Sequence, residues 1–289
     1  MRFSISTPNF DPASDPQTLA EMAREAEHAG WDGFFVWDHL LLDPAGWPIT
    51  DPWIALAAIA MATQRIRIGT MVTPLPRRHP WTLARQTVAV DRLSGGRLIL
   101  GVGLGDPARV EFGAFGQETD VHVRAEQLDE GLAILAGLWS GEPFSFSGKH
   151  YRLSEMTFLP TPVQRPRIPI WVGGYWPRKA PMRRAARWDG VNPLKTDMAS
   201  FTPNDLREIV AYIGEHRTSD APFDVVAGGE TPGGDDPAEW AAAGATWWIE
   251  PIHPQRFAAG VGGEPGSDDR RRAVLTAMTE RIRQGPPRV

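Results

Sequence analysis

Short apolar runs alternate with amphipathic segments from one end of the chain to the other. The apolar runs end at glycine, proline or polar residues, which is typical of strands buried on both faces. The segments between them open with proline or a capping residue and end near glycine, which predicts helices. The predicted strands are Phe3–Thr7, Gly33–Trp37, Arg65–Thr73, Arg97–Leu100, Ile170–Gly174, Gly190–Asn192, Asp224–Ala227 and Thr246–Ile249.

Each of these eight strands is followed by a predicted helix. The helices are Pro16–His28, Asp51–Ala62, Pro80–Leu93, His122–Trp139, Arg178–Arg187, Pro203–His216, Ala238–Ala243 and Asp268–Arg283. Strict alternation predicts an α/β fold, a (β/α)8 TIM barrel that forms one domain over residues 1–289. A doubly wound open sheet is the alternative. Residues 144–153 interrupt the alternation and predict a short hairpin inserted before the fifth strand, and the glycine-rich stretch 258–267 is expected to be mobile.

Composition narrows the chemistry. The chain has 289 residues, a net charge of -5 and no cysteine, which excludes disulfides, cysteine nucleophiles and thiolate metal sites. The acidic balance argues against nucleic acid as a partner. The longest apolar stretch, 52–62, is too short to cross a bilayer, and no apolar leader precedes the first strand. We therefore expect a cytoplasmic protein without membrane association.

Polar residues and glycines follow almost every predicted strand. In a parallel barrel the carboxyl ends of the strands meet at one face, so this pattern predicts an enzyme site there. The residues concerned are Asp38, His39, Thr70, Thr73, Gly105, Asp106, Gly173, Gly174, Asn192, Lys195, Glu250 and His253. No Gly-x-Ser-x-Gly, His-x-His or His-Glu-x-x-His motif occurs, and Gly101-x-Gly-x-Gly lacks dinucleotide spacing. We predict no metal; a hydrolytic metal site on Asp38, His39 and Asp106 is the rival hypothesis.

Several of these segments carry a family resemblance. The chain resembles the bacterial-luciferase-like flavin monooxygenases and deazaflavin-dependent reductases, in order, from the first strand to about Asn192. The matching segments are Trp37–His39, Gly69–Pro74, His79–Pro80, Leu93–Arg97, Gly101–Gly103, Leu128–Glu130, Leu138–Gly141, Pro162–Gln164, Pro169–Gly174 and Asp189–Gly190. Beyond Asn192 the resemblance thins, and the prediction rests on the strand count.

The resemblance implies a barrel that binds a reduced flavin, or its deazaflavin analogue, across strands two to four. It also implies a non-proline cis peptide within Thr70-Met71-Val72, which would form a bulge behind the ring; an ordinary strand end is the alternative. In relatives the histidine that matches His39 faces the reactive edge of the ring, where imidazole can exchange a proton. Asp38 would hold its tautomer or bind the ring, unless the pair merely caps a loop.

Asp106 occupies the position at which deazaflavin sugar-phosphate dehydrogenases carry a glutamate that acts as an acid, so the resemblance implies a catalytic acid or base role for Asp106. Its alternative role is to cap the segment that starts at Pro107. Those dehydrogenases also carry a tryptophan shortly after the histidine, where this chain has Leu41-Leu42-Asp43. This departure argues against a glucose-6-phosphate-type substrate.

A phosphate site is predicted beside the ring. Gly173 and Gly174 precede a helix, whose amides attract anions, and Asn192 and Lys195 on the next strand would complete the site. A tight turn and a solvated lysine are the alternatives. Arg178 or Lys179 would reach an extended phosphate tail, although most of that basic helix is expected to face solvent.

We expect a luciferase-like monooxygenase that uses reduced FMN and dioxygen on a small organic substrate, with a flavin reductase as a possible partner. The alternative is hydride transfer with the deazaflavin coenzyme F-420, and a further one is a non-catalytic flavin-binding barrel. Trp47 and Trp176 would line the substrate pocket or only cover the core. The apolar helices 51–62 and 80–93 would supply the face of a homodimer.

Overall fold

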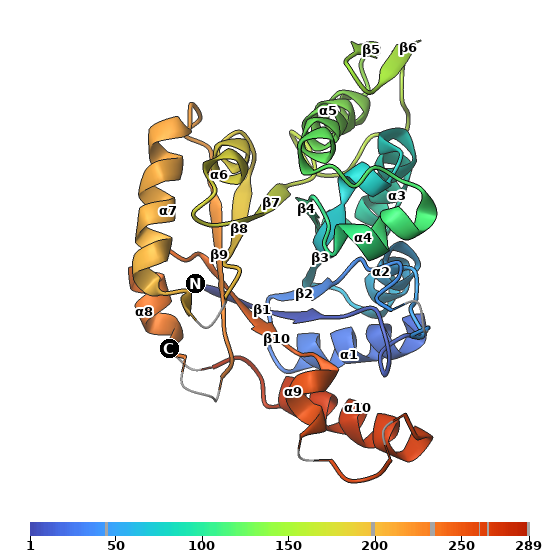
Figure 1. Cartoon of the computed structure of the whole chain (residues 1–289), viewed down its shortest axis with the longest axis vertical. Helices are drawn as coiled ribbons and strands as arrows, with labels where there is room; N and C mark the ends of the chain where they lie inside the picture. Colours follow the sequence, from blue (N-terminus) through green and yellow to red (C-terminus); the bar gives the residue numbers. More distant parts are fainter. Residues whose placement is uncertain (44–45, 198–199, 232–234, 260, 265, 288–289) are drawn as a thin grey trace.

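Eight parallel strands close into a barrel in a computed structural model that describes residues 1–43, 46–197, 200–231, 235–259, 261–264 and 266–287. Around the barrel the order is β1, β2, β3, β4, β7, β8, β9 and β10, which pairs back with β1 (Figure 1). Their bounds are Arg2–Thr7, Gly33–Val36, Arg67–Pro74, Leu98–Gly103, Ile170–Tyr175, Gly190–Leu194, Asp224–Gly228 and Trp247–Pro251. The predicted TIM barrel is confirmed, and the open sheet is excluded.

Helices surround the barrel and mostly begin one residue after an oxygen-bearing cap. The side chains of Asp15, Asp51, Asp120, Thr202, Asp236 and Ser267 all accept amide hydrogen bonds in this way. The helices are α1 Pro16–His28, α2 Pro52–Ala62, α3 Pro80–Leu93, α4 Ala108–Glu111, α5 Val121–Ser140, α6 Lys179–Ala185, α7 Pro203–His216, α8 Pro237–Ala242, α9 Pro254–Ala258 and α10 Asp268–Arg283. Two 3-10 turns, η1 Leu75–Arg77 and η2 Gly113–Phe115, complete the elements.

Two elements differ clearly from the sequence prediction, β4 and α9. β4 runs on to Gly103 instead of ending at Leu100, because its glycines continue the ladder with β3 and β7. α9 was not predicted, since five residues carry no helical period. The stretch 258–267 includes residues 260 and 265, which lie outside the described part of the chain. Among the described helices, none is long and apolar enough to cross a membrane.

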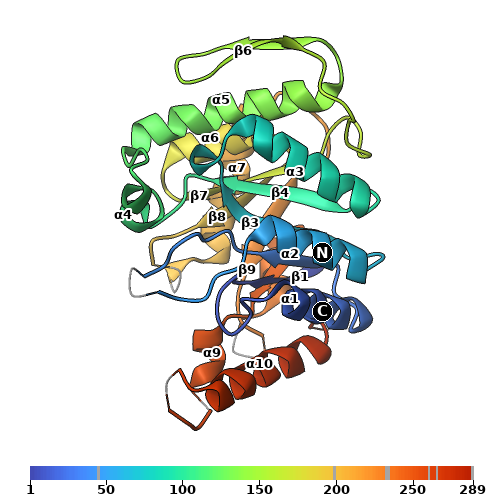
Figure 2. The ribbon, with the colours of Figure 1, turned by 90° about the vertical axis from the view of Figure 1, so that its right-hand side faces the viewer.

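The predicted hairpin is present as β5 Phe144–Ser147 and β6 Arg152–Met156. It lies outside α5, at the end of the molecule opposite α10 (Figure 2). The carboxylate of Glu130 on α5 accepts hydrogen bonds from the amides of Lys149, His150 and Tyr151, which attaches the hairpin turn to the helix. The hairpin is therefore an outer decoration and contributes nothing to the barrel mouth.

Aromatic side chains fill part of the barrel interior. Phe35, Trp171 and Trp247 are fully buried, and the Trp171 ring lies 5.3 Å from Phe35 and 5.1 Å from Trp247 between ring centres. Met71 packs against this cluster from the carboxyl ends of the strands. The barrel is thus a packed core that gives loops at the strand ends a firm base.

A bulge interrupts β3 where it faces that base. The register between β3 and β4 shifts between Thr70 and Thr73, and the Met71–Val72 peptide is cis, as the sequence resemblance predicts. The neighbouring strand must be bare of side chains here. A Cβ added to Gly101 would lie 2.1 Å from the Thr70 carbonyl oxygen, and one on Gly103 would lie 2.7 Å from Val72.

We predict that Gly101→Ala destabilises the protein by about 2 kcal/mol or more, because the new methyl overlaps a strand carbonyl that cannot move freely. Gly214→Ala is the matched control: it lies within α7 with open space around its Cα, so it should stabilise by about 0.5–1 kcal/mol. Urea unfolding of both variants measures the difference. Equal stability changes would contradict the tight β3–β4 approach.

Candidate active site

A cavity of about 290 Å³ opens at the carboxyl ends of β2, β3, β4, β7 and β8. Its floor is formed by the bulge and by strand ends that carry glycine, while its sides carry several charged residues. The residues that line it include Trp37, Asp38, His39, Met71, Val72, Gly103, Asp106, Glu111, Arg124, Gly173, Gly174, Tyr175, Arg178, Pro181, Arg184 and Leu194. The cavity has the size and location expected of an enzyme site in a barrel.

His39 stands at the edge of this cavity, and the structure fixes its orientation. Its Nδ1 lies 2.9 Å from Oε1 of Glu111. The buried side chain of Asn9 holds the backbone, accepting from the His39 amide and donating to its carbonyl over 2.9 Å. Because a carboxylate accepts at Nδ1, that nitrogen carries the proton. Nε2, which has no hydrogen-bond partner in the described residues, is then an unprotonated acceptor.

Glu111 is held in turn by a buried charge cluster. Arg77 donates to the Glu111 carboxylate and, over 2.5 Å, to Asp38 Oδ1. Arg78 donates to both Asp38 oxygens over 3.1 and 2.8 Å, and the Thr73 hydroxyl donates to Asp38 Oδ2 over 2.8 Å. Two guanidinium groups therefore face two carboxylates, which satisfies the buried charges.

Asp38 does not hold the tautomer of His39, contrary to the sequence hypothesis. Its carboxylate is 1% exposed and is engaged by Arg77, Arg78 and Thr73. Glu111, 72 positions away from His39, performs that task. No periodic or motif signal marks Glu111, since it lies in a four-residue helix; the dibasic Arg77-Arg78 after β3 is the signal that sequence reasoning overlooked.

The surroundings of His39 keep its imidazole neutral. Burial, together with the positive charge of Arg77, lowers the pKa of His39 from 6.5 to about 4, although Asp38 and Asp106 oppose this. At neutral pH the ring is therefore uncharged. A neutral imidazole with a free Nε2 is suited to accept a proton from a hydroxyl group.

Asp106 also lines the cavity, on the loop after β4. It does not cap the following helix: the cap residue of α4 is Pro107, and no side-chain bond caps it. Across the cavity, burial and the charge of Asp106 raise the pKa of Tyr175 above its usual value of 10.0, so its hydroxyl remains protonated. Asp106 and the protonated Tyr175 hydroxyl thus add two polar groups to the cavity lining.

The predicted phosphate site is only partly brought together. Gly173 and Gly174 line the cavity but lie inside β7, not at the start of α6 or in a tight turn. They are bare because a Cβ would meet Val72 at 3.1 Å and Pro181 at 2.2 Å. Lys195 lies outside the lining: it pairs with Asp205 over 3.0 Å, where it supports the capping box of α7.

Asn192 and Thr70 likewise lie outside the lining. Asn192 is within β8, and Leu194 of the same strand reaches the cavity instead. Thr70 is fully buried beneath the bulge, where its hydroxyl donates to the Gly101 carbonyl over 3.0 Å. Of the bulge residues, Met71 and Val72 line the floor. Thr70 is therefore a support of the floor and not a ligand contact.

Cationic side chains surround the cavity on the side of β4, α5 and α6. Arg124 donates to the carbonyls of Leu104 and Gly105, each over 2.8 Å, and its buried Nε has no hydrogen-bond partner among the described residues. Arg184 is paired with Asp129. Arg178 is exposed and makes no side-chain bond within the described part of the chain, so it is free to bind an anion. No group of acidic or histidine side chains in that part forms a metal site.

The two tryptophans named from the sequence lie apart. Trp176 is 6% exposed and packs edge-on against Tyr212 at 6.3 Å, so it covers the core. Trp47 lies on the loop after β2, 43% exposed, and lines a second cavity.

Comparison with known proteins agrees with this geometry. The model of the luciferase-like monooxygenase family matches residues 1–284, and the chain belongs to that family. A relative from Mycobacterium tuberculosis, an F420-dependent hydroxymycolic acid dehydrogenase, is 31% identical over 273 residues, covering 91% of this chain and 70% of the relative. An F420-dependent glucose-6-phosphate dehydrogenase from Nakamurella multipartita is 34% identical over 167 residues, which cover 56% of this chain.

The chain thus matches only 48% of the Nakamurella relative's length. Among solved structures, an F420-dependent secondary alcohol dehydrogenase in complex with an F420-acetone adduct superposes with a TM-score of 0.72. It is 17% identical, and the match covers 88% of this chain and 94% of the other. At this identity the likeness establishes a shared fold.

We predict that Glu111→Gln destabilises the protein by about 3 kcal/mol, because Asp38 would then be the one carboxylate facing the two guanidinium groups of Arg77 and Arg78, which leaves a buried positive charge unbalanced. Glu126→Gln is the matched control, since Glu126 also binds a histidine and a cation, His150 and Lys149, but is 45% exposed. That change should cost far less stability, because solvent screens the charges of an exposed ion pair. Urea unfolding measures both, and comparable losses would show that the cluster carries no special weight.

The pKa of His39 predicts a stability change with pH. In the unfolded chain the imidazole binds a proton near pH 6.5, and in the folded chain only near pH 4. The contribution of neutral His39 to the free energy of unfolding is therefore complete above about pH 6.5 and is lost as the pH falls through about 4. His39→Gln should make the free energy of unfolding less dependent on pH within this window. An unchanged pH dependence would contradict a neutral, buried His39.

Proposed function

We propose that the protein is an F420-dependent oxidoreductase that moves a hydride between a deazaflavin and the carbinol carbon of a small alcohol. The observation that carries this proposal is the neutral His39 with a free Nε2 at the edge of a bulge-floored cavity. A base is what alcohol oxidation requires, since a hydroxyl proton must leave as the hydride departs. The Mycobacterium and Nakamurella relatives, both named as F420-dependent dehydrogenases, support the choice of F420.

The residues present fit a flat, anionic cofactor. Gly103 and Gly173 leave the floor beside Val72 without further side chains, because a Cβ on either glycine would meet Val72. The buried, unpartnered Nε of Arg124 and the exposed Arg178 offer donors at the cavity wall and mouth. Met71 and Val72 would support the ring, and Arg178 would bind acidic groups of the tail. When bound, a deazaflavin supplies a two-electron hydride acceptor.

His39 would act as the general base. Nε2 accepts the substrate hydroxyl proton while the C–H bond gives up its hydride and the carbinol carbon becomes a carbonyl. The Nδ1–H···Glu111 hydrogen bond would stabilise the imidazolium that forms, and Arg77 binds the same carboxylate. The protonated Tyr175 hydroxyl, which lines the cavity with Asp106, would donate a hydrogen bond to the substrate oxygen.

A monooxygenase with reduced FMN and dioxygen, the main expectation from the sequence, is the less supported reading. The family's name covers such enzymes, but the named relatives depend on F420. A flavin reductase is needed as a partner only in the FMN reading. A homodimer formed by α2 and α3 stays a prediction, as does a binding role without catalysis.

The decisive experiment titrates the purified protein separately with F420 and FMN and then follows F420 reduction by 2-propanol without oxygen. We predict tighter binding of F420 and measurable turnover. His39→Ala should lower kcat about 100- to 10,000-fold with little change in the Kd of F420. His150→Ala, on the outer hairpin, is the control and should leave both constants unchanged.

Three results would contradict the proposal in different ways. Oxygen consumption with reduced FMN but no F420 reduction would favour the monooxygenase. F420 binding without turnover, on 2-propanol or bulkier alcohols, would favour a non-catalytic barrel. Full activity of His39→Ala would remove the base from its role.

A further inference from the structure

The side chain of Asn9, on the segment that follows β1, is fully buried and uses both its amide hydrogens and its carbonyl oxygen. Oδ1 accepts from the His39 amide over 3.2 Å, and Nδ2 donates to the His39 carbonyl over 2.9 Å. The other Nδ2 hydrogen goes to the Thr50 carbonyl over 2.7 Å. The carboxamide thus pairs with both backbone groups of the proposed base, as a residue of an antiparallel strand would.

His39 and Thr50 lie near the two ends of the segment that joins β2 to α2. The Thr50 end has a second attachment, because its amide donates to the Asn9 carbonyl over 2.9 Å. The amide and carbonyl of His39 have no hydrogen-bond partner other than Asn9 within the described part of the chain. Loss of the carboxamide would therefore release the backbone of His39 more than that of Thr50.

Glu111 holds the same region from the opposite side. Its carboxylate binds the His39 ring at Nδ1 and accepts from the amide of Leu40 over 3.1 Å. Glu111 thus constrains the ring and the next residue, whereas Asn9 constrains the backbone of His39 itself. The two side chains are complementary, and neither repeats the contacts of the other.

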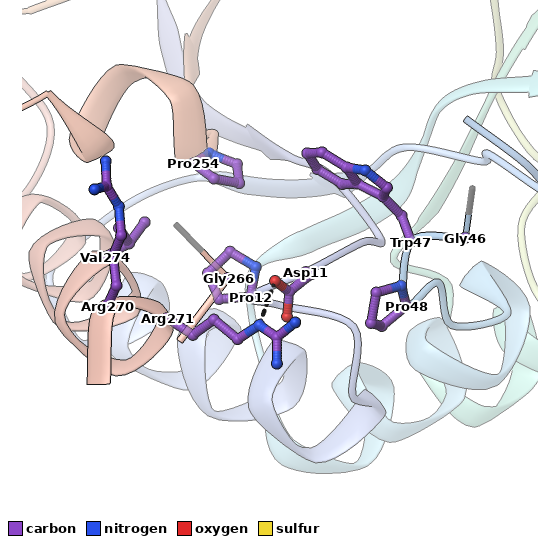
Figure 3. Close-up of a pocket in the computed structure, with 10 residues that line it drawn as sticks. All are labelled: Asp11, Pro12, Gly46, Trp47, Pro48, Pro254, Gly266, Arg270, Arg271 and Val274. Carbon is purple, nitrogen blue, oxygen red and sulfur yellow. Dashed lines mark hydrogen bonds and ion pairs between the residues drawn. The ribbon is translucent and has the colours of Figure 1, made fainter. Parts of the chain in front are cut away.

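The segments after β1 and β2 also line a second cavity, of about 360 Å³ (Figure 3). Among the described residues, this cavity and the active-site cavity have no lining residue in common. The Phe10 ring, 2% exposed, lies with its centre 5.5 Å from that of Trp47 and 6.1 Å from that of His39. Phe10, the neighbour of Asn9 in the chain, therefore separates the imidazole from the second cavity.

The pKa of His39 reports how well its ring is kept in place. Burial is the largest cause that lowers this pKa to about 4, so a ring that moved toward water would titrate higher. The contacts of Asn9 involve uncharged groups only, so its loss changes the pKa through movement of the ring. The charged side chains around the imidazole are Asp38, Arg77, Asp106 and Glu111.

We infer that Asn9 is a positioning residue for the base: its carboxamide fixes the backbone of His39 so that Nε2 faces the active-site cavity. Asn9 lines neither cavity, so it acts through His39 and not on a ligand. The inference rests on the proposed function for its effect on hydride transfer. The placement of the imidazole is a property of the protein without cofactor.

The first arm of the test uses the protein free of cofactor. Ring ¹⁵N shifts of His39, assigned with His39→Gln, are followed against pH in wild type, Asn9→Ala and Thr87→Val. Thr87 is the matched control because it is fully buried and accepts from Trp139 Nε1 over 3.1 Å, between α3 and α5. We expect the pKa of His39 to rise from about 4 toward 6.5 in Asn9→Ala and to stay near 4 in Thr87→Val.

The second arm uses the enzyme loaded with F420 and 2-propanol as substrate. Asn9→Ala should lower kcat about 10- to 100-fold, because a displaced base is poorly aligned with the hydroxyl. The Kd of F420 should not change, and Thr87→Val should leave both constants as in wild type.

Circular dichroism checks that each variant is folded. Asn9→Ser serves in place of Asn9→Ala if the alanine variant does not fold, since its hydroxyl keeps one hydrogen-bond donor. The pKa of His39 should then rise by less, but in the same direction.

The outcomes separate the two proposals. A His39 pKa that stays near 4 in the folded Asn9 variant overturns the positioning role, even if F420 is reduced. A raised pKa without any F420 reduction by wild type supports the positioning role and overturns the proposed function. An equal rise in Thr87→Val, or a Kd of F420 that weakens as much as kcat falls, would also overturn the assignment.

Discussion

The site depends on a buried pairing of two carboxylates, Asp38 and Glu111, with two guanidinium groups, Arg77 and Arg78. These four side chains come from the end of β2, the turn after β3 and the short helix α4. Isolated charges in such a place would be strongly destabilising, so each must find its partner for the loops to close. Closure of the loops is thus coupled to the arrangement of charge, and Glu111 takes one position relative to β2.

That position decides the chemistry of His39. With a carboxylate at Nδ1 and burial together with Arg77 lowering its pKa, the imidazole is neutral and presents Nε2 as an acceptor. Asn9 adds a backbone clamp that joins the loop after β1 to the loop after β2. The bulge in β3 supplies the flat floor beside the base, and it fits because β4 and β7 carry glycine opposite Val72.

The fold was readable from the sequence because each strand is a short apolar run and each helix has a local start signal. The sequence also placed the strand-end residues at one face, because the carboxyl ends of parallel strands meet there. Asp38, His39, Asp106, Gly173 and Gly174 line one cavity. The predicted hydrogen-bond partner of His39 was wrong. Asp38 adjoins His39 in sequence but points into the charge cluster, and Glu111 replaces it through a contact formed only in the folded chain.

Lys195 is a second residue whose contact could not be predicted from its position in the sequence. Its position after a strand suggested an anion site, but its ammonium group pairs instead with Asp205 in the capping box of α7. Glu250, also at a strand end, is fully buried and paired with Arg281 of α10, so it secures that helix and not a ligand. Strand-end position therefore predicts which face a residue occupies, while competition among charged neighbours decides what it contacts.

The tautomer of His39 tests the central claim most directly, through the ring ¹⁵N chemical shifts of the folded protein at neutral pH. The account predicts a neutral ring with the proton on Nδ1, and a loss of that preference in a chain that lacks the Glu111 carboxylate. An imidazolium, or a neutral ring protonated on Nε2, would contradict it.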